Sequence, residues 1–401
     1  MRSPDFAVVG GGIVGLCVAR ELKRRYRDCR VCLFEREPRC GLHASGRNSG
    51  VLHAGFYYSA DSLKARFCRR GNEALTEYCL ARGLPINRCG KLVVARGAAD
   101  LAQFPLLLER ASKNGVPLTE VSAMEARRLE PNVKTCERAL FSPSTSAVDP
   151  AAVCAALAAD AAAEGVEVRC GEAVRGPGGA AGELVTSAGR ISAGYAINCA
   201  GARALGLAHA FGVGAEWRVL PFEGRYLVGS AAAAPHRVHV YPVPDLEMPF
   251  LGVHTTIDVH GQLRLGPTAL PVCWLERRAE RPVMSLSVLL SVALTGMRLL
   301  LRGGRSYRRL ALRELRLAHR RQLLAAAGEL VDGLSLAAFA AWGTSGIRAQ
   351  LVARRGTALE MDFIVRGSGR ALHVLNAVSP GFTSAMPCAE HVVDQIDTLG
   401  R

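Results

Sequence analysis

The chain has 401 residues, enough for one large domain or for two domains that share a core. Nearly half of the residues are apolar and no long polar tract interrupts them, which excludes a disordered protein. The net charge of +15 comes almost entirely from Arg. It fits an anionic lipid, an anionic substrate or a coding bias that favours Arg. Nucleic acid fits least well, because the sequence contains no nucleic-acid-binding module.

The first forty residues predict a strand, a glycine turn, a helix and a second strand. Residues 6–9 are a short apolar run, residues 16–26 have helical spacing, and residues 30–34 form an apolar strand that ends at Glu35. An acidic residue at the end of a second strand suits a ribose hydroxyl pair. This arrangement predicts a dinucleotide-binding unit.

The turn of this unit carries Gly10, Gly12 and Gly15 in the spacing G-x-G-x-x-G. Gly10 permits the tight turn, Gly12 lets the backbone approach a pyrophosphate, and Gly15 lets the helix pack closely against the strand. The phosphates face the N-terminus of the helix. The turn alone does not distinguish FAD from NAD.

The thirteen cysteines and the absence of a basic leader followed by an apolar segment favour a reducing compartment. Cys29 and Cys32 form a C-x-x-C, but they lie in a predicted strand that points them to opposite faces. No second pair has zinc-finger spacing. We therefore expect both to be buried small hydrophobes and no metal site. The protein is expected to be cytoplasmic, with peripheral attachment to the inner face of the cell membrane left open.

Residues 41–55 form a loop rich in small and polar side chains, and a loop of this length is usually functional. Here the sequence resembles the D-amino-acid-oxidase-like superfamily of flavoproteins and, within it, the L-2-hydroxyglutarate dehydrogenase/oxidase family. The matching pieces are residues 45–55, Tyr57-Tyr58 and residues 62–65. In the superfamily this segment follows the pyrophosphate and ribityl chain to the flavin ring, so the resemblance implies FAD, held non-covalently.

Further along, Asp149 before Pro150 predicts the N-cap of a helix that runs to about Glu164. Residues 166–174 read as a strand whose end, by the resemblance, touches adenine. Residues 191–198 read as another apolar strand, which closes with Asn198-Cys-Ala-Gly201, similar to the second flavin-binding turn of the superfamily.

Four segments between residues 217 and 275 predict a substrate-domain sheet and resemble the hydroxyglutarate family specifically. They are residues 221–226, 241–244, 249–256 and 265–269. The likeness covers nearly the whole chain and breaks down only around residues 275–335.

Residues 283–301 are nineteen residues with a single charge, Arg298, a length that by itself suggests a membrane span. The polar residues fall in one stripe of a helix, however, and Arg-rich segments follow. The stripe consists of Ser287, Ser291, Thr295, Arg298 and Arg302. Such a helix suits an anionic bilayer surface, or equally a helix packed against the sheet or in a dimer interface.

Oxidation of a 2-hydroxy acid by flavin needs a carboxylate anchor, a base for the hydroxyl proton and a hydride aimed at flavin N5. Arg348 lies in a segment that resembles the superfamily's substrate anchor, and a guanidinium binds carboxylates bidentately. His53 is favoured as the base because its loop should end beside the flavin ring, and His254 is the rival. Two His on opposite sides of a ligand could also divide the roles of base and anchor.

Residues 376–384 resemble the loop that opens the last helix of the superfamily, whose N-terminus stabilises negative charge at flavin N1 and O2. Gly381 allows close approach there, and Thr383 is a further donor. Phe382 departs from the small residues usual at this place, and it either narrows the site or turns away.

These observations predict a mixed α/β fold, with a Rossmann-like FAD-binding domain and an interleaved antiparallel-sheet substrate domain. Residues 1–80, 145–215 and 335–401 are assigned to the first, and residues 81–144 and 216–334 to the second.

The predicted function is FAD-dependent oxidation of L-2-hydroxyglutarate to 2-oxoglutarate, with oxygen, a quinone or an electron-transfer protein open as acceptor. The alternatives are a related flavin enzyme for glycine, a D-amino acid or glycerol 3-phosphate, and a flavin-binding scaffold without turnover.

The predicted catalytic residues are His53, His254 and Arg348. The predicted cofactor-binding residues are Gly10, Gly12, Ile13, Val14, Gly15, Glu35, Arg36, Ser45, Gly46, Arg47, Asn48, Ser49, Val174, Cys199, Ala200, Gly201, Ser379, Gly381, Phe382 and Thr383.

Overall fold

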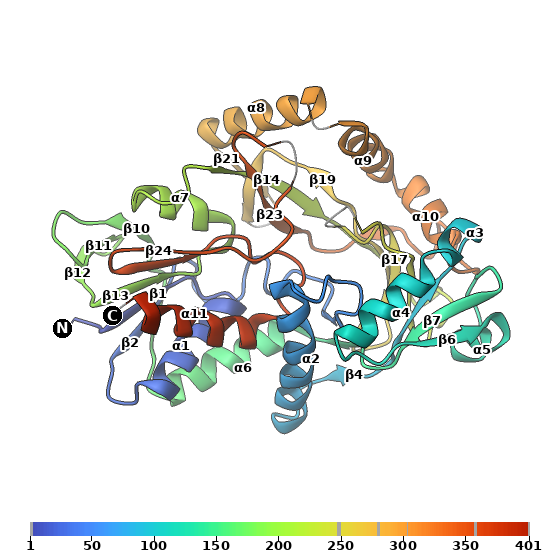
Figure 1. Cartoon of the computed structure of the whole chain (residues 1–401), viewed down its shortest axis with the longest axis horizontal. Helices are drawn as coiled ribbons and strands as arrows, with labels where there is room; N and C mark the ends of the chain where they lie inside the picture. The colour runs from blue at the N-terminus through green and yellow to red at the C-terminus, as the bar shows by residue number, and fades with distance from the viewer. Residues whose placement is uncertain (1–2, 247–249, 279–280, 303, 357–358, 400–401) are drawn as a thin grey trace.

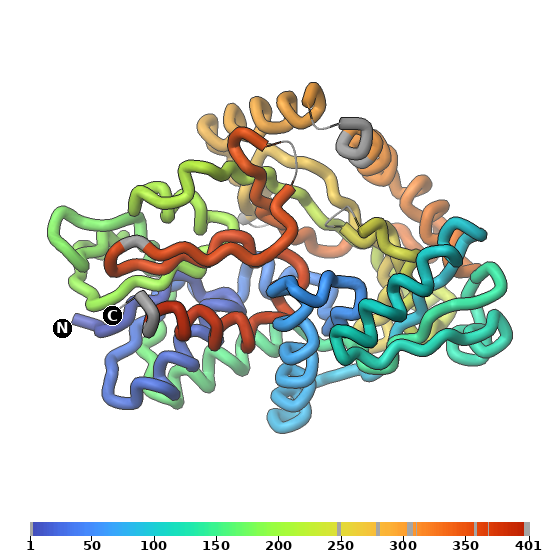
Figure 2. The backbone as a smooth tube through the Cα atoms, viewed as in Figure 1, coloured from blue at the N-terminus to red at the C-terminus, as the bar shows by residue number. Residues whose placement is uncertain are grey.

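The computed structural model of the chain describes residues 3–246, 250–278, 281–302, 304–356 and 359–399. Two large sheets dominate these residues, and Figure 1 shows them at opposite ends of the molecule. Figure 2 shows that the C-terminal segment returns to lie beside the N-terminal one. The predicted mixed α/β class is confirmed.

The six-stranded sheet carries the glycine turn. Its strands are parallel except for the edge strand β24, which runs antiparallel to β25. In order across the sheet they are β24 (Val365–Ser368), β25 (Ala371–Val374), β13 (Tyr195–Asn198), β1 (Phe6–Val9), β2 (Val31–Glu35) and β9 (Glu167–Cys170).

Both faces of this sheet are covered, as its nearly continuous apolar strands require. Val8 and Leu33 point to the helical side, which is formed by α1 (Ile13–Arg25), α6 (Pro150–Ala163) and α11 (Ala385–Leu399). Ala7 and Phe34 point to the other side, where a small antiparallel sheet covers them. That sheet contains β10 (Val174–Pro177), β11 (Glu183–Thr186) and β12 (Arg190–Ser192).

The eight-stranded sheet is antiparallel except for one parallel pair, β16 with β5. In order, its strands are β22 (Ala341–Trp342), β15 (Leu227–Val228), β18 (Leu263–Gly266), β17 (His254–Ile257), β16 (His239–Pro242), β5 (Lys91–Val94), β7 (Arg138–Ser142) and β6 (Thr119–Ser122). A three-stranded antiparallel sheet lies between the two large ones in Figure 1. It consists of β19 (Leu270–Pro271), β14 (Trp217–Gly224) and β23 (Gly346–Ala353).

The remaining elements connect or flank these sheets. The strands are β3 (Val51–Leu52), β4 (Ile86–Asn87), β8 (Ser146–Val148), β20 (Trp274–Arg278) and β21 (Arg281–Met284). The helices are α2 (Leu63–Ala81), α3 (Ala98–Leu101), α4 (Phe104–Lys113), α5 (Ala123–Leu129), η1 (Gly201–Arg203), α7 (Ala204–Ala210), α8 (Leu286–Arg302), α9 (Gly304–Leu317) and α10 (Arg320–Gly328).

Several predicted boundaries are wrong, and turns explain them. The strand predicted over 191–198 is two strands in different sheets, because the chain turns at Gly194, whose N–H donates to Pro4 O. The strand predicted over 166–174 likewise breaks after Cys170, at Gly171 with φ +81°. Local apolar composition does not reveal a change of sheet.

Two further boundaries differ from the prediction. Cys29 precedes β2 instead of lying in it, and only Cys32 is fully buried in that strand, where burial raises the pKa of its thiol to about 12. The apolar helix predicted from residue 283 begins at Leu286, because Val283 belongs to β21.

The division into domains stays a prediction, but the sheets cross it. β22 and β23 lie in the range 335–401, which was assigned to the FAD-binding domain. They pair with β15 and β14, from the range assigned to the substrate domain. The C-terminal part of the chain therefore contributes to both regions.

The predicted N-cap at Asp149 is confirmed: its Oδ1 accepts from the N–H groups of Ala151 at 2.8 Å and Ala152 at 3.1 Å. Asp149→Ala should lower the free energy of unfolding by about 1 kcal/mol, because α6 loses this acceptor. Urea unfolding followed by circular dichroism would measure the change. Asp149→Asn keeps the acceptor and should cost clearly less; an equal loss in both variants would contradict the capping role.

Candidate active site

A cavity of about 350 Å³ lies where the carboxyl ends of the parallel strands face the antiparallel sheets. Gly10 after β1, Glu35 at the end of β2 and Cys199 after β13 line one part of it. Tyr241 and His254, from β16 and β17, line another. A cavity at this edge is the expected ligand position in an open parallel sheet.

The glycine turn brings three backbone segments into contact. Gly10 has φ +109°, and a Cβ there would lie 2.4 Å from Cys199 O. A Cβ at Gly15 would lie 1.9 Å from Gly10 O. Only glycine is compatible with these contacts, so the turn can bring a dinucleotide close to the backbone.

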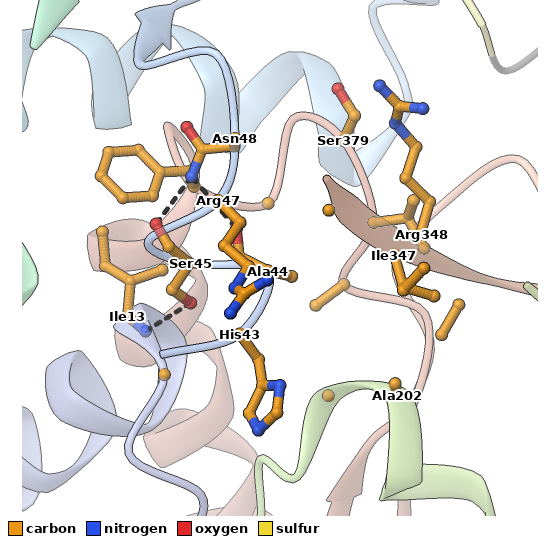
Figure 3. Close-up of a pocket in the computed structure, with 18 of the residues that line it drawn as sticks. Ile13, His43, Ala44, Ser45, Arg47, Asn48, Ala202, Ile347, Arg348 and Ser379 are labelled. Atoms are coloured by element: carbon orange, nitrogen blue, oxygen red, sulfur yellow. Dashed lines mark hydrogen bonds between the residues drawn. The ribbon is translucent and has the colours of Figure 1, made fainter. Parts of the chain in front are cut away.

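The N-terminus of α1 opens toward the cavity without an acidic residue in its first turn. The Ile13 N–H donates to Ser45 Oγ at 3.0 Å, and Figure 3 shows these two residues on one wall of the pocket. The helix dipole and the Ser45 hydroxyl suit the pyrophosphate of a dinucleotide.

Glu35 is held in place by the backbone on both sides. Its Oε2 accepts from the Gly11 N–H at 2.7 Å, and its Oε1 accepts from the Glu37 N–H at 2.9 Å. Each oxygen keeps a second lone pair for a ligand. The carboxylate therefore fits the adenosine ribose of FAD.

Glu276 joins the antiparallel part of the protein to the nucleotide-binding strands. Arg203 Nη2 donates to Glu276 Oε1 at 2.7 Å, and Arg36 forms an ion pair with Oε2. Although burial opposes ionisation, hydrogen bonds from the two guanidinium groups lower the pKa of Glu276 to about 2. The side chain of Arg36 is thus committed to a bridge between sheets.

The loop before α11 reaches the cavity and is tied to the loop of residues 41–55. Thr383 Oγ1 donates to Val51 O at 3.3 Å and accepts from the His53 N–H at 3.2 Å. A Cβ at Gly381 would lie 2.6 Å from Ala377 O. Phe382 lines the cavity and packs against the core beneath it.

Both predicted histidines line the cavity and are held in the neutral form. Burial, followed by the charges of Lys91 and His239, lowers the pKa of His53 to about 3. Burial and then His53 lower the pKa of His254 well below its usual value. Near pH 7 both imidazoles are therefore neutral, so each ring has one nitrogen lone pair.

The two rings differ in how they are oriented. His254 Nδ1 donates to Gly252 O at 2.9 Å, and the ring stacks on Tyr241 with centroids 3.8 Å apart. This hydrogen bond places the proton on Nδ1, so Nε2 carries the lone pair. His53 Nδ1 has no hydrogen-bond partner in the described part of the chain.

Arg348 lies on β23, opposite Phe222 of β14, and Figure 3 shows it across the pocket from Ser45. Its Nη1 donates to Thr268 O at 3.1 Å, and a Cβ at Gly224 would lie 2.6 Å from Nη1. No carboxylate among the described residues pairs with it. The guanidinium keeps donors for a carboxylate of a ligand.

Of the twenty-three predicted site residues, twenty-one line this one cavity. The other two, Gly15 and Gly46, contact backbone instead; a Cβ at Gly46 would lie 2.3 Å from Gly41 O. The structure thus brings together residues from positions 10 to 383, and the individual roles of these residues stay predictions.

Lys91 was missed by the sequence analysis. It is 1% exposed, and its Nζ lies 4.5 Å from the ring centroid of Phe56 and 4.9 Å from that of Tyr241. Burial lowers the pKa of Lys91 to about 8. The sequence did contain a signal for this residue, because the chain has only five lysines and this one lies within an apolar strand.

Tyr226, Tyr241 and Glu276 line the cavity, which Lys91 does not, and they too were not singled out. All thirteen cysteines are free, and the described residues contain no group of His, Cys, Asp or Glu that could hold a metal ion. Within the same residues, no helix has the length and apolar character needed to cross a membrane.

Known structures share this fold. L-alpha-glycerophosphate oxidase from Mycoplasma pneumoniae, with FAD bound, aligns with a TM-score of 0.76 at 21% identity, covering 99% of this chain and 95% of that one. Glycine oxidase from Geobacillus kaustophilus aligns with a TM-score of 0.74 at 20% identity, with the same coverages.

Sequence comparison identifies nearer relatives. L-2-hydroxyglutarate dehydrogenase of Escherichia coli K12 is 33% identical over 98% of this chain and 93% of its own length. The mitochondrial L-2-hydroxyglutarate dehydrogenase of Homo sapiens is 31% identical over 98% and 88%. The profile of the FAD dependent oxidoreductase family, DAO, matches residues 5–395. With a cavity that fits FAD, these matches confirm the resemblance: the chain belongs to the FAD dependent oxidoreductase family, in the group of the L-2-hydroxyglutarate dehydrogenases, and its cofactor is FAD.

Proposed function

We propose that this protein oxidises L-2-hydroxyglutarate to 2-oxoglutarate. The observation that carries the proposal is the convergence of His53, His254 and Arg348 at one cavity. The name and substrate of the relatives that match 98% of the chain support the choice of substrate.

Arg348 would bind a carboxylate of the substrate through its unpaired donors. Lys91, buried behind Tyr241 and without a carboxylate partner in the described residues, adds positive potential beside the histidines. Two cationic side chains near neutral imidazoles suit a dianion better than a zwitterionic amino acid.

His254 is proposed as the base that takes the hydroxyl proton. Its Nδ1–H is fixed by Gly252 O, which leaves Nε2 as the acceptor. The sequence analysis favoured His53, but the ring nitrogen Nδ1 of His53 has no orienting partner. His53 is therefore assigned to hold a polar group of the substrate.

FAD, held by the glycine turn, Ser45 and Glu35, would supply the two-electron oxidant that takes the hydride from C2 of the substrate. The hydroxyl proton goes to His254, and the C2–O bond becomes the carbonyl. Thr383 does not take part directly, because its hydroxyl fixes the backbone of Val51 and His53. No part of this proposal depends on the electron acceptor, so oxygen, a quinone and an electron-transfer protein all stay open.

The first test is anaerobic. L-2-hydroxyglutarate added to the purified FAD-loaded protein should bleach the visible absorbance of the oxidised flavin, because the flavin takes two electrons from the substrate. The D-enantiomer is the control and should not bleach it. Bleaching by glycine, a D-amino acid or glycerol 3-phosphate instead would assign a related activity, and no bleaching by any of these would favour a flavin-binding scaffold.

A second prediction concerns the base. His254→Gln should slow anaerobic flavin reduction about 10²- to 10⁴-fold, because no group accepts the hydroxyl proton. It should also abolish the rise of the rate with pH, which in the parent lies below the usual histidine range because burial lowers the pKa of His254. His53→Gln should mainly weaken substrate binding, with a smaller effect on the limiting rate. Stopped-flow reduction across pH measures both, and the reverse pattern would assign the base to His53.

A third prediction concerns the anchor. Arg348→Lys should weaken substrate binding about 10- to 100-fold, because a charge-assisted hydrogen bond worth roughly 1.5–3 kcal/mol is lost. Gly224→Ala should act in the same direction, since its methyl group displaces the guanidinium. The substrate dependence of the reduction rate gives both values. Arg127→Lys, on the exposed surface of α5, is the matched control, and equal effects there would refute a specific anchor.

A further inference from the structure

A single peptide group, the one between Thr268 and Ala269, lies directly behind the substrate anchor. Its carbonyl oxygen accepts from Arg348 Nη1 at 3.1 Å, and its N–H donates to Glu314 Oε2 at 2.6 Å. The peptide bond is trans, so its C=O and N–H point in opposite directions within one plane. Arg348 and Glu314 are therefore joined through the two sides of one rigid group.

Thr268 itself is fixed to the end of strand β14. Its Oγ1 accepts from the Arg225 N–H and donates to Glu223 O, both at 3.1 Å, and its own N–H donates to Arg225 O at 3.0 Å. These bonds hold the residue in place, but none of them acts on the peptide group that follows it. The rotation of that peptide group sets the direction of the Thr268 carbonyl, and the hydrogen bond to Glu314 restrains this rotation.

The direction of the Arg348 guanidinium depends on this carbonyl. In the described part of the chain, the Thr268 oxygen is the hydrogen-bond acceptor that the guanidinium uses. Two other neighbours limit its position by shape. A Cβ at Gly224 would lie 2.6 Å from Nη1, and the ring centroid of Phe250 is 5.8 Å from Cζ. A guanidinium binds a carboxylate bidentately only when its planar fork faces it, so a rotated carbonyl would misdirect the anchor.

Glu314 is an exception within helix α9. The helix contains five Arg and this one acidic residue. Glu314 is 2% exposed and lies, with the buried Leu317, on the side of α9 that packs against the protein near β19 (Figure 1). Its Oε1 pairs with the guanidinium of Arg313 at 3.2 Å. Burial of a carboxylate is unfavourable, and a neutral amide could accept from one N–H equally well. Packing alone therefore does not explain the negative charge.

The charge strengthens the hydrogen bonds on both sides of the peptide group. A hydrogen bond to an ionised acceptor is stronger than a neutral one, and successive hydrogen bonds in a buried place polarise one another. A carboxylate at the Ala269 N–H therefore makes the Thr268 oxygen a better acceptor for Arg348. Because the peptide group lies between the two charges, Glu314 supports the guanidinium without pairing with it, and the remaining donors stay available for a ligand.

We propose that Glu314 is a positioning residue for the substrate anchor, because it fixes the direction of the Arg348 guanidinium through the Thr268–Ala269 peptide group. Glu314 also lines the cavity, but its carboxylate repels the carboxylates of a ligand. It therefore acts through the peptide group and not by contact with the substrate. The inference rests on the proposed function, because it takes Arg348 as the group that binds a substrate carboxylate.

The test uses the FAD-loaded full chain and anaerobic stopped-flow flavin reduction at a series of L-2-hydroxyglutarate concentrations. Glu314→Leu removes the acceptor, and it should raise the dissociation constant of the substrate about tenfold, with a smaller effect on the limiting rate. Glu314→Gln keeps an acceptor for the Ala269 N–H and should return the dissociation constant to within about threefold of the parent value.

A further variant keeps the charge and changes only the reach of the side chain. Glu314→Asp is one methylene shorter, so its carboxylate withdraws from the Ala269 N–H. It should weaken substrate binding in the same direction as Glu314→Leu. This variant tests the positioning role even where the leucine variant does not fold.

Glu130 is the matched control. It is a second fully buried carboxylate that accepts from backbone N–H groups, those of Arg237 at 2.6 Å and Asn132 at 3.2 Å, and it does not line the cavity. Glu130→Leu should lower the temperature of thermal unfolding, as Glu314→Leu does, but leave the dissociation constant of the substrate unchanged. A similar rise of the dissociation constant in both variants would mean a general loss of packing and would overturn the proposal.

A double-mutant cycle tests the connection to the anchor. In the background of Arg348→Lys, Glu314→Leu should weaken substrate binding clearly less than it does in the parent, because residues that act as one unit are not additive. Equal fold-changes in the two backgrounds would mean that Glu314 acts independently of Arg348, which would refute the positioning role.

The outcomes separate this inference from the proposed function. If L-2-hydroxyglutarate reduces the parent flavin and binds Glu314→Leu and Glu314→Asp as tightly as the parent, the positioning role is wrong and the proposed function stands. If another small acid reduces the parent flavin instead, the proposed substrate is wrong, and the same variants with that acid decide the positioning role. If no acid binds to the parent, both are wrong.

Discussion

Two backbone turns touch at the centre of the molecule, and the rest of the site is arranged around that contact. The turn after β1 meets the turn after β13 so closely that a side chain at Gly10 would enter Cys199 O, and α1 approaches Gly10 O equally closely at Gly15. The five parallel strands end at the same edge, and the cavity opens there. The loops of residues 41–55 and 376–384 close it from two sides and are fastened to each other by Thr383.

The two ends of the cavity use different chemistry. The nucleotide end is built from backbone groups, a helix N-terminus and the fixed carboxylate of Glu35. The substrate end is built from buried side chains, with neutral histidines near Arg348 and Lys91. Glu276 connects the two ends. It lies on β20 and forms ion pairs with Arg36 and Arg203, which line the nucleotide end. A dianionic ligand would complete the charge balance of the substrate end, in keeping with the proposed function.

The sequence could predict what depends on neighbours along the chain. The turn at Gly10 and the cap at Asp149 follow from local backbone requirements, and both are found. Which distant residues meet depends on sheet pairing, so only the family resemblance pointed to Arg348. Nothing local shows that 191–198 changes sheets or that Glu276 has two Arg partners. The polar stripe of α8 was recognised, but its direction depends on carbonyls about fifty residues further along the chain.

The wall of the cavity extends along nearly the whole chain, from Gly10 to Thr383, and this has a consequence for biosynthesis. A ribosome releases the N-terminal strands first, so the early dinucleotide turn exists before β23 and the loop leading into α11. During that interval the nascent chain has an incomplete FAD site, and its apolar strand edges are uncovered. The complete FAD site therefore exists only once the C-terminal loop has been synthesised, and a ligand bound there stabilises the finished fold.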